Sequence, residues 1–109
     1  MPYDEGLAQR LRETLSDRVG VVEKKMFGGL AFMVQGHMTV GITGEDLMAR
    51  VGPDEYAGAL SEPGAREMDF TGRALKGFVY VAPDGIASDA DLARWVDRAV
   101  TFTGSLPPK

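Results

Sequence analysis

Cysteine is absent from the 109-residue sequence, which excludes disulfides, thiolate nucleophiles, iron–sulfur clusters and cysteine-type zinc sites. An excess of basic residues is absent too: 12 Lys and Arg stand against 16 Asp and Glu, a formal net charge of −4. Because DNA binding needs a basic face, this balance predicts no direct nucleic-acid binding. The longest apolar run, residues 30–34, is far shorter than the roughly 20 residues of a spanning helix, so no membrane role is predicted.

Histidine is almost absent as well. His37 is the only one, and no Ser, Cys or second His stands at a useful spacing from it. We interpret it as a solvated polar residue beside a turn. Asp84, Asp89 and Asp91 lack the ligand pattern of an EF-hand and are interpreted as a turn followed by acids at a helix N-terminus. The sequence therefore predicts no catalytic residue, no metal site, no cofactor and no enzymatic activity.

The composition is that of an ordinary globular protein, with 44% hydrophobic and 26% charged residues. The length fits one domain, residues 1–109. The acidic N-terminus has neither the basic region nor the apolar region of a secretion signal, so a cytoplasmic location is predicted.

The apolar spacing predicts three helices and six strands. Leu7, Leu11 and Leu15 recur every four residues and indicate a first helix after Asp4. A second helix is predicted to open with Pro53 at its first position, and a third to begin at Asp89 and to anchor on the sheet through Trp95. The strands are predicted over residues 21–27, 30–33, 37–42, 46–51, 66–70 and 77–82, with a loop at 71–73.

The short turns between the first four strands require them to be largely antiparallel. The predicted fold is therefore α+β: a two-layer sandwich with a mainly antiparallel sheet and the order α-β-β-β-β-α-β-β-α. Within it, a hairpin around residues 34–36 admits two registers. A two-residue loop would pair Phe32 with Thr39, whereas a three-residue loop pairs Phe32 with Met38. The second gathers more apolar residues, Met38 among them, on one face, and we predict it.

Three helices can cover one face of this sheet, and the other face is predicted to be unusually apolar. Its outward residues would include Ala31, Met33, His37, Thr39, Gly41, Met48 and Arg50, with either Phe78 and Tyr80 or Val79 and Val81. A continuous apolar patch marks an interface, so we predict that a partner, most simply a second copy of the chain, covers this face. The alternative is that the first helix or the C-terminal tail covers it.

The most unusual local run is Lys24–Gly29, two bases and an aromatic followed by two glycines. One interpretation is an anion-binding nest, and the other is a strand that ends in a close backbone crossing. Basic residues also gather in the middle of the chain, which could form a local basic patch on an acidic protein. They are Lys24, Lys25, Arg50, Arg66, Arg73 and Lys76.

Three stretches of the sequence closely resemble the N-terminal domain of the TfoX/Sxy competence regulators. They are residues 25–38, 47–52 and 68–81. The resemblance covers about residues 3–106. It implies an α+β domain of a bacterial cytoplasmic protein connected with control of competence gene expression. Full-length regulators of that family carry a second, helical domain, so this chain is expected to act as a stand-alone N-terminal-like domain.

The sequence thus favours a non-enzymatic regulatory or protein-interaction module that forms a homodimer and has a protein partner in gene regulation. The alternative is a binder of phosphate ligands or nucleic acid through the local basic patch. The predicted interface or binding residues are Lys24, Lys25, Phe27, Gly28, Gly29, Met33, Met48, Arg50, Arg73 and Lys76.

Overall fold

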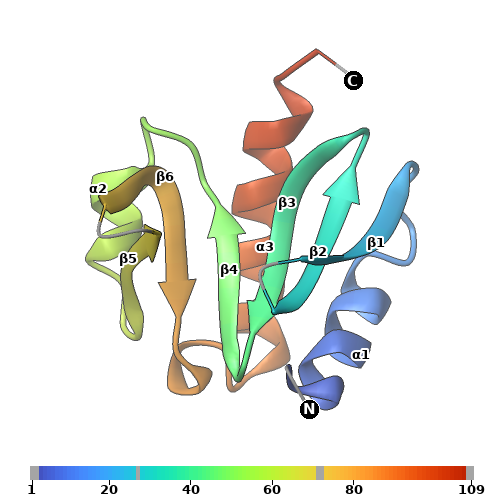
Figure 1. Ribbon diagram of the computed structural model, residues 1–109, viewed down its shortest axis with the longest axis horizontal. Helices are drawn as coiled ribbons and strands as arrows, with labels where there is room; N and C mark the ends of the chain where they lie inside the picture. The colour runs from blue at the N-terminus through green and yellow to red at the C-terminus, as the bar shows by residue number, and fades with distance from the viewer. Residues whose placement is uncertain (1–2, 27, 71–72, 108–109) are drawn as a thin grey trace.

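The computed structural model describes residues 3–26, 28–70 and 73–107, and leaves the side chains of residues 26, 69, 70 and 73–75 undescribed. Figure 1 shows the arrangement of its helices and strands. In chain order they are α1 Glu5–Thr14, β1 Val21–Met26, β2 Gly29–Val34, β3 His37–Thr43, β4 Asp46–Arg50, α2 Tyr56–Leu60, β5 Ala65–Phe70, β6 Arg73–Val81, the 3-10 helix η1 Pro83–Gly85 and α3 Asp89–Gly104. The predicted α+β class and the order of helices and strands are confirmed.

The strands form one antiparallel sheet in the order β1-β2-β3-β4-β6-β5. Helix α3 lies behind β3 and β4 in the view of Figure 1, and α2 packs against β5 and β6. All three helices contribute to a single core on that side of the sheet. Trp95 is its largest fully buried side chain, as the sequence predicted. We call this side the helix-covered face and the opposite side the open face.

Side-chain caps fix where the two long helices begin. The Asp4 carboxylate accepts hydrogen bonds from the backbone N–H groups of Gly6 and Leu7, at 2.8 and 3.2 Å. The Ser88 hydroxyl accepts one from the backbone N–H of Asp91 at 3.0 Å. Both caps satisfy donors that have no partner inside the first helical turn, and both were predicted from the sequence. In the described ranges no helix is long and apolar enough to cross a membrane.

The β2–β3 hairpin differs from its prediction. Its loop has two residues, Gln35 and Gly36, with φ of 55° and 86°, and Val34 pairs with His37. Positive φ at both positions is the signature of a type I′ turn, whose twist matches that of the strands. The apolar register is restored by a β-bulge at Thr39, after which Phe32 pairs with Val40. The predicted three-residue loop was therefore wrong.

The bulge also changes which face three residues occupy. Thr39 and His37 were predicted on the open face, but Thr39 is fully buried with its hydroxyl 3.0 Å from that of Thr103 in α3. His37 is likewise buried, against the backbone carbonyl of Pro107. Met38 was predicted beside Phe32, but it pairs with Met33 and shares its face. One extra residue in β3 accounts for all three corrections, because side chains alternate between faces along a strand.

The open face is less exposed than predicted. Ala31, Gly41 and Met48 are neighbours across β2, β3 and β4, and all three are buried within the protomer. Ala31 and Met48 have no exposed surface at all. The aromatic residues of β6 that share this face are Phe78 and Tyr80, both half-buried. The centre of the open face is therefore already covered by the chain itself.

Two boundaries of the prediction need correction. Helix α2 begins at Tyr56, because residues 53–55 form a turn rather than the first helical positions. Strand β6 begins at Arg73, four residues earlier than predicted, because residues 73 and 74 pair with β5. Of the predicted loop at 71–73, Thr71 and Gly72 lie outside the described residues.

Candidate functional site

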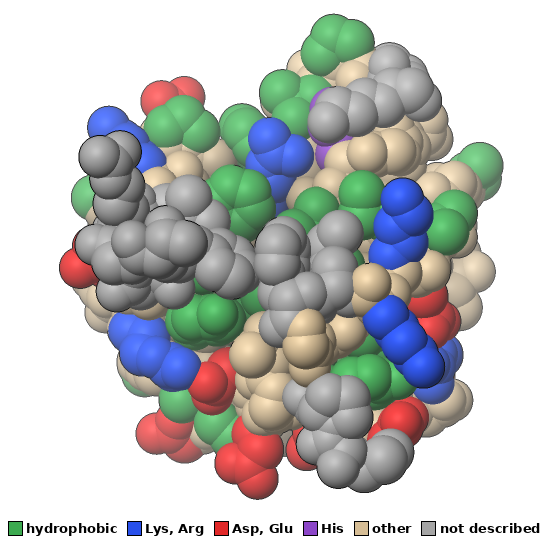
Figure 2. Space-filling view, viewed as in Figure 1, with side chains coloured by type: hydrophobic (Ala, Val, Ile, Leu, Met, Phe, Trp, Pro, Cys, Tyr) green, Lys and Arg blue, Asp and Glu red, His purple; other side chains and the backbone are tan. Residues whose placement is uncertain are grey.

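The basic residues named from the sequence do not form one patch. Lys24 and Lys25 are exposed on β1, which is one edge of the sheet. Arg50 ends β4, and Lys76 lies in the adjacent strand β6. Strands β2 and β3 separate the two pairs. Around the open face, acidic side chains gather along the lower edge and basic ones are spread over the sides and the top (Figure 2).

The other predicted binding residues have varied surroundings. Met33 is half-buried on the open face, whereas Met48 is fully buried on the same face. Arg73 belongs to β6, with its side chain undescribed, and Phe27 lies outside the described residues. Gly28 is exposed.

The surroundings of Gly29 distinguish the two interpretations of the Lys24–Gly29 run, an anion-binding nest and a close backbone crossing. A Cβ atom at this position would lie 1.9 Å from the backbone oxygen of Ile42 in β3. No side chain can be accommodated there, so glycine is required for the close approach of two backbones. This geometry supports the interpretation of a tight strand crossing.

Arg50 and Lys76 line one small cavity of about 80 Å³, together with Gly52, Pro53, Gly77, Phe78 and Phe102. The guanidinium carbon of Arg50 lies 5.4 Å from the ring centre of Phe78 and also 5.4 Å from that of Phe102. Both aromatic faces attract the cation and hold it in place. We call this arrangement the Arg50 cleft.

The position of Phe102 in α3 depends on Gly52. A Cβ atom at Gly52 would lie 2.3 Å from the Phe102 ring, and Gly52 has a φ of 87°, which favours glycine. The backbone N–H groups of Val51 and Gly52 both donate to the carbonyl of Gly77, at 2.8 and 3.1 Å. The chain leaving β4 is thus joined to β6 and pressed against α3 at this point, which sets the shape of the Arg50 cleft.

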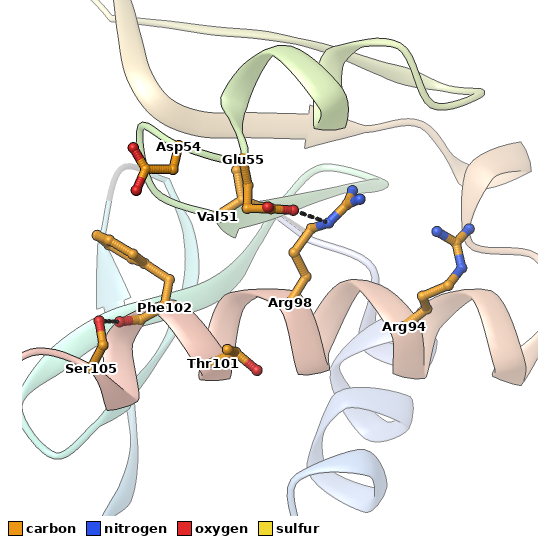
Figure 3. A pocket seen from close by; sticks show the side chains of 8 residues that line it. All are labelled: Val51, Asp54, Glu55, Arg94, Arg98, Thr101, Phe102 and Ser105. Carbon is orange, nitrogen blue, oxygen red and sulfur yellow. Dashed lines mark hydrogen bonds and ion pairs between the residues drawn. The ribbon is translucent and has the colours of Figure 1, made fainter.

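A larger cavity of about 550 Å³ lies beside this cleft, between α3 and the segment that leads from β4 into α2. The Phe102 ring belongs to both cavities. Figure 3 shows Asp54 and Glu55 on one side of the larger cavity and the side chains of α3 on the other. Its lining residues are Val51, Asp54, Glu55, Arg94, Arg98, Thr101, Phe102 and Ser105.

Ion pairs connect α3 to the flanks of α2 beside this cavity. Arg98 places its Nε 3.5 Å from Glu55 and its Nη2 3.5 Å from Glu62, while its guanidinium stacks on Trp95 at 5.0 Å. Arg94 pairs with Glu62 at 3.3 Å and with Asp91 at 3.4 Å. The hydrogen bond to Asp91, with the contribution of Glu62, raises the pKa of Arg94.

His37 is held away from both cavities. Its Nε2 donates a hydrogen bond to the carbonyl of Pro107 at 2.6 Å, because a carbonyl can only accept. Its Nδ1 is buried and has no hydrogen-bond partner in the described part of the chain. The expectation of a solvated histidine was wrong, because the bulge turns this side chain toward the C-terminal end of α3. Among the described residues, no three His, Cys, Asp or Glu side chains are grouped to hold a metal ion.

Sequence reasoning named Arg50 and Lys76 but missed Phe102 and Arg98. Phe102 lies in the last helix and is half-buried at the cavity. Arg98 and Arg94 stand four residues apart, so they share one face of α3. Two arginines at this spacing, together with the acids within residues 54–62, are the signal that could have indicated ion pairs between α2 and α3 beside the site.

The architecture defines a class: a small α+β domain whose single antiparallel sheet carries helices on one face. A family model, the TfoX N-terminal domain, matches residues 13–103. This range includes the whole sheet and nearly all of α3. The chain therefore belongs to the TfoX N-terminal domain family. Neither the curated proteins nor the solved structures compared with the chain contain a match.

Proposed function

We propose that the chain is a non-catalytic regulatory module of the cytoplasm that binds protein, acts in control of gene expression, and associates with a second copy of itself. Membership of the TfoX N-terminal domain family supports the regulatory part of the proposal. What the domain binds is set by its surface, because one fold can carry many different binding surfaces.

The observation that carries the protein-binding part is a row of apolar side chains on the open face. Val22 of β1 pairs with Met33 of β2, which pairs with Met38 of β3. Val22 is 55% exposed, and the two methionines are half-buried. We call these three residues the apolar row.

The chemistry of the apolar row fits a protein surface. Methionine side chains are flexible and polarisable, so they adapt to the shape of a partner. The row also begins on the edge strand β1, whose outer backbone groups have no strand partner in the described sheet. A second copy placed symmetrically would cover both rows with one self-complementary contact.

The test is the oligomeric state of the full chain and of Met33→Asp. We expect a dimer of twice 11.7 kDa for the native chain by light scattering at micromolar concentration, and a monomer for Met33→Asp, because a buried unpaired carboxylate is costly at an interface. Met33→Leu is the matched control, which keeps the apolar contact and should remain dimeric.

Circular dichroism separates the interface from the fold. Met33→Asp should keep the secondary structure and a cooperative melting transition, because Met33 is already half-exposed to solvent. A monomeric native chain would overturn the proposed self-association. An unfolded Met33→Asp protein beside a folded Met33→Leu protein would instead make Met33 part of the core.

A further inference from the structure

Arg50 differs from the other arginines whose side chains the structure describes. Six of them form ion pairs with carboxylates: Arg10, Arg12, Arg18, Arg66, Arg94 and Arg98. Arg50 forms none with any carboxylate that the structure describes, although the chain carries more acids than bases. Its charge is half-buried against aromatic rings rather than paired with an acid. Such a cation favours an anion from outside the chain.

The stacking also sets the direction in which Arg50 binds. Phe78 and Phe102 contact the guanidinium group, which fixes its position and leaves hydrogen-bond donors at its edge. Those donors lie in one plane and form a fork that suits the two oxygens of a phosphoryl or carboxylate group. The aromatic contacts therefore reduce the freedom that Arg50 would otherwise lose on binding an anion.

The Arg50 cleft has the size and charge for one such group. Lys76 lines it with Arg50, and none of the described residues that line it is acidic. Its volume of about 80 Å³ compares with about 30 Å³ for a water molecule in the liquid, so it can hold a single oxyanion group.

The neighbouring cavity has room for the rest of a ligand. Its volume of about 550 Å³ lies within the roughly 300–1,000 Å³ of small-molecule sites. Val51 and the Phe102 ring supply apolar surface, while Thr101 and Ser105 supply hydroxyl groups. Arg94 and Arg98 also line it, but Glu55, Glu62 and Asp91 already hold both in ion pairs. Asp54, on the same wall, would repel an anionic group. The negative end of a ligand is therefore directed past Phe102 to Arg50, whose charge no described carboxylate pairs.

We propose that the Arg50 cleft binds the phosphoryl or carboxylate group of a small organic molecule whose planar or apolar body enters the cavity between α2 and α3. This role goes beyond protein binding through the apolar row, and it uses different residues. Of the basic residues that the sequence offers for a phosphate ligand, the proposed site uses Arg50 and Lys76 and does not use Lys24 or Lys25.

The experiment is a titration of the ¹⁵N-labelled full chain, followed by amide chemical shifts. The probes are phenyl phosphate and benzoate, which join an anion to a ring, inorganic phosphate and acetate, which lack the ring, and benzyl alcohol, which lacks the charge. We expect saturable shifts of the Gly52, Gly77 and Phe102 amides with at least one of the two ring-bearing anions. The tighter of the two identifies phosphoryl or carboxylate as the preferred group. The anion that lacks the ring of this tighter probe, inorganic phosphate or acetate, should bind at least tenfold more weakly than the probe. Benzyl alcohol should also bind at least tenfold more weakly.

Variants locate the site. Arg50→Gln and Lys76→Gln should each raise the dissociation constant of the preferred probe at least tenfold, and Arg50→Lys should recover part of the loss by restoring charge without the fork. Lys24→Gln makes the same charge change on the edge strand β1, which β2 and β3 separate from β4, and should leave the constant unchanged. A well-dispersed amide spectrum of Arg50→Gln confirms that the variant is folded.

Three results would overturn the proposal. The first is the absence of saturable shifts with both ring-bearing anions. The second is a dissociation constant that Arg50→Gln does not change. The third is an equal loss from Lys24→Gln, which would mean attraction by overall charge. None of these results depends on whether the chain forms a dimer, since Met33→Asp tests that separately.

Discussion

The two faces of the sheet are both buried at the centre, but they are buried by different means. On the helix-covered face, large side chains such as Phe32 and Ile42 meet Trp95 in one core. On the open face the central positions are Ala31, Gly41 and Met48, which are small or flexible. An apolar strand face therefore does not need a layer of helices to be excluded from water.

Polar side chains help to complete the open face. Arg66 of β5 pairs with Asp46 of β4 and stacks over the ring of Tyr80 at 4.9 Å, so it spans β6. The Thr43 hydroxyl donates to the sulfur of Met48 at 3.3 Å. A long charged side chain can cover apolar surface with its stem while its head stays in water. Sequence periodicity does not reveal this kind of cover.

Leu47 and Met48 allow a direct comparison of the packing on the two faces. They are consecutive in β4, so they lie on opposite faces, and neither has exposed surface. We expect Leu47→Ala to lower the free energy of unfolding by about 3–4 kcal/mol and Met48→Ala by about 2–3 kcal/mol. The smaller effect follows from the flexibility of the methionine side chain itself, whose packing is less specific than that of Leu47. Urea denaturation of both variants gives the two values.

A Met48→Ala cost below about 1 kcal/mol would contradict the picture of a packed open face. Met48→Leu is the control, since a swap that nearly conserves volume costs less than about 1.5 kcal/mol in a buried position. The same measurement on Met38→Ala, at a half-buried position of that face, should give a smaller loss than Met48→Ala.

Gly41 tests how tightly the open face is packed. A Cβ atom there would lie 2.6 Å from the terminal methyl of Met48 and 2.8 Å from the backbone oxygen of Leu30. The methyl group can move but the backbone oxygen cannot, so Gly41→Ala should destabilise the fold by about 1–3 kcal/mol. The midpoint of chemical denaturation measures the loss, and Gly58→Ala, at an open position of α2, is the control. An unchanged midpoint for Gly41→Ala would mean that β2 and β3 are not in close contact there.

The smallest expected effect on stability comes from an ion pair on the helix-covered side. Arg12 of α1 donates two hydrogen bonds to Glu23 of β1, at 2.7 and 2.9 Å. These bonds lower the pKa of Glu23. A carboxyl group whose pKa is lowered by folding stabilises the fold above its unfolded pKa of about 4.3, and this stabilisation is lost as the pH falls below that value.

Glu23→Gln should therefore melt slightly lower than the native chain at pH 7, and the difference should shrink toward pH 3. Thermal melting at the two pH values measures this, with Glu45→Gln, an exposed glutamate on the β3–β4 turn, as the control. A difference that persists unchanged at pH 3 would show that the ion pair is not its cause.

Most of the fold could be predicted because it rests on local signals. The spacing of Leu7, Leu11 and Leu15, the caps at Asp4 and Ser88, and the alternation in the strands each act over a few residues. The hairpin register could not be predicted, because the turn preferred by Gln35 and Gly36 conflicts with the apolar register. The bulge at Thr39 resolves that conflict, and no rule of composition places it.

The candidate site was predicted only in part for the same reason. Arg50 and Lys76 could be named as basic residues, but their meeting depends on the pairing of β4 with β6. Residues 51–72, with α2 and β5, lie between these two strands in the chain. Phe102 comes from a third region, and its place follows from the contact with Gly52. Long-range contacts of this kind leave no short pattern in a sequence.

The bulge at Thr39 has a consequence for changes in the length of the chain. Removing one residue from the middle of a strand usually reverses the faces of all residues on one side of the deletion. Here the removal of Thr39 would leave Met33 opposite Met38 and Phe32 opposite Val40, with regular alternation throughout, while the ladder from Val40 to β4 stays as it is. This hairpin is therefore a place where the sequence can lose a residue and keep its topology.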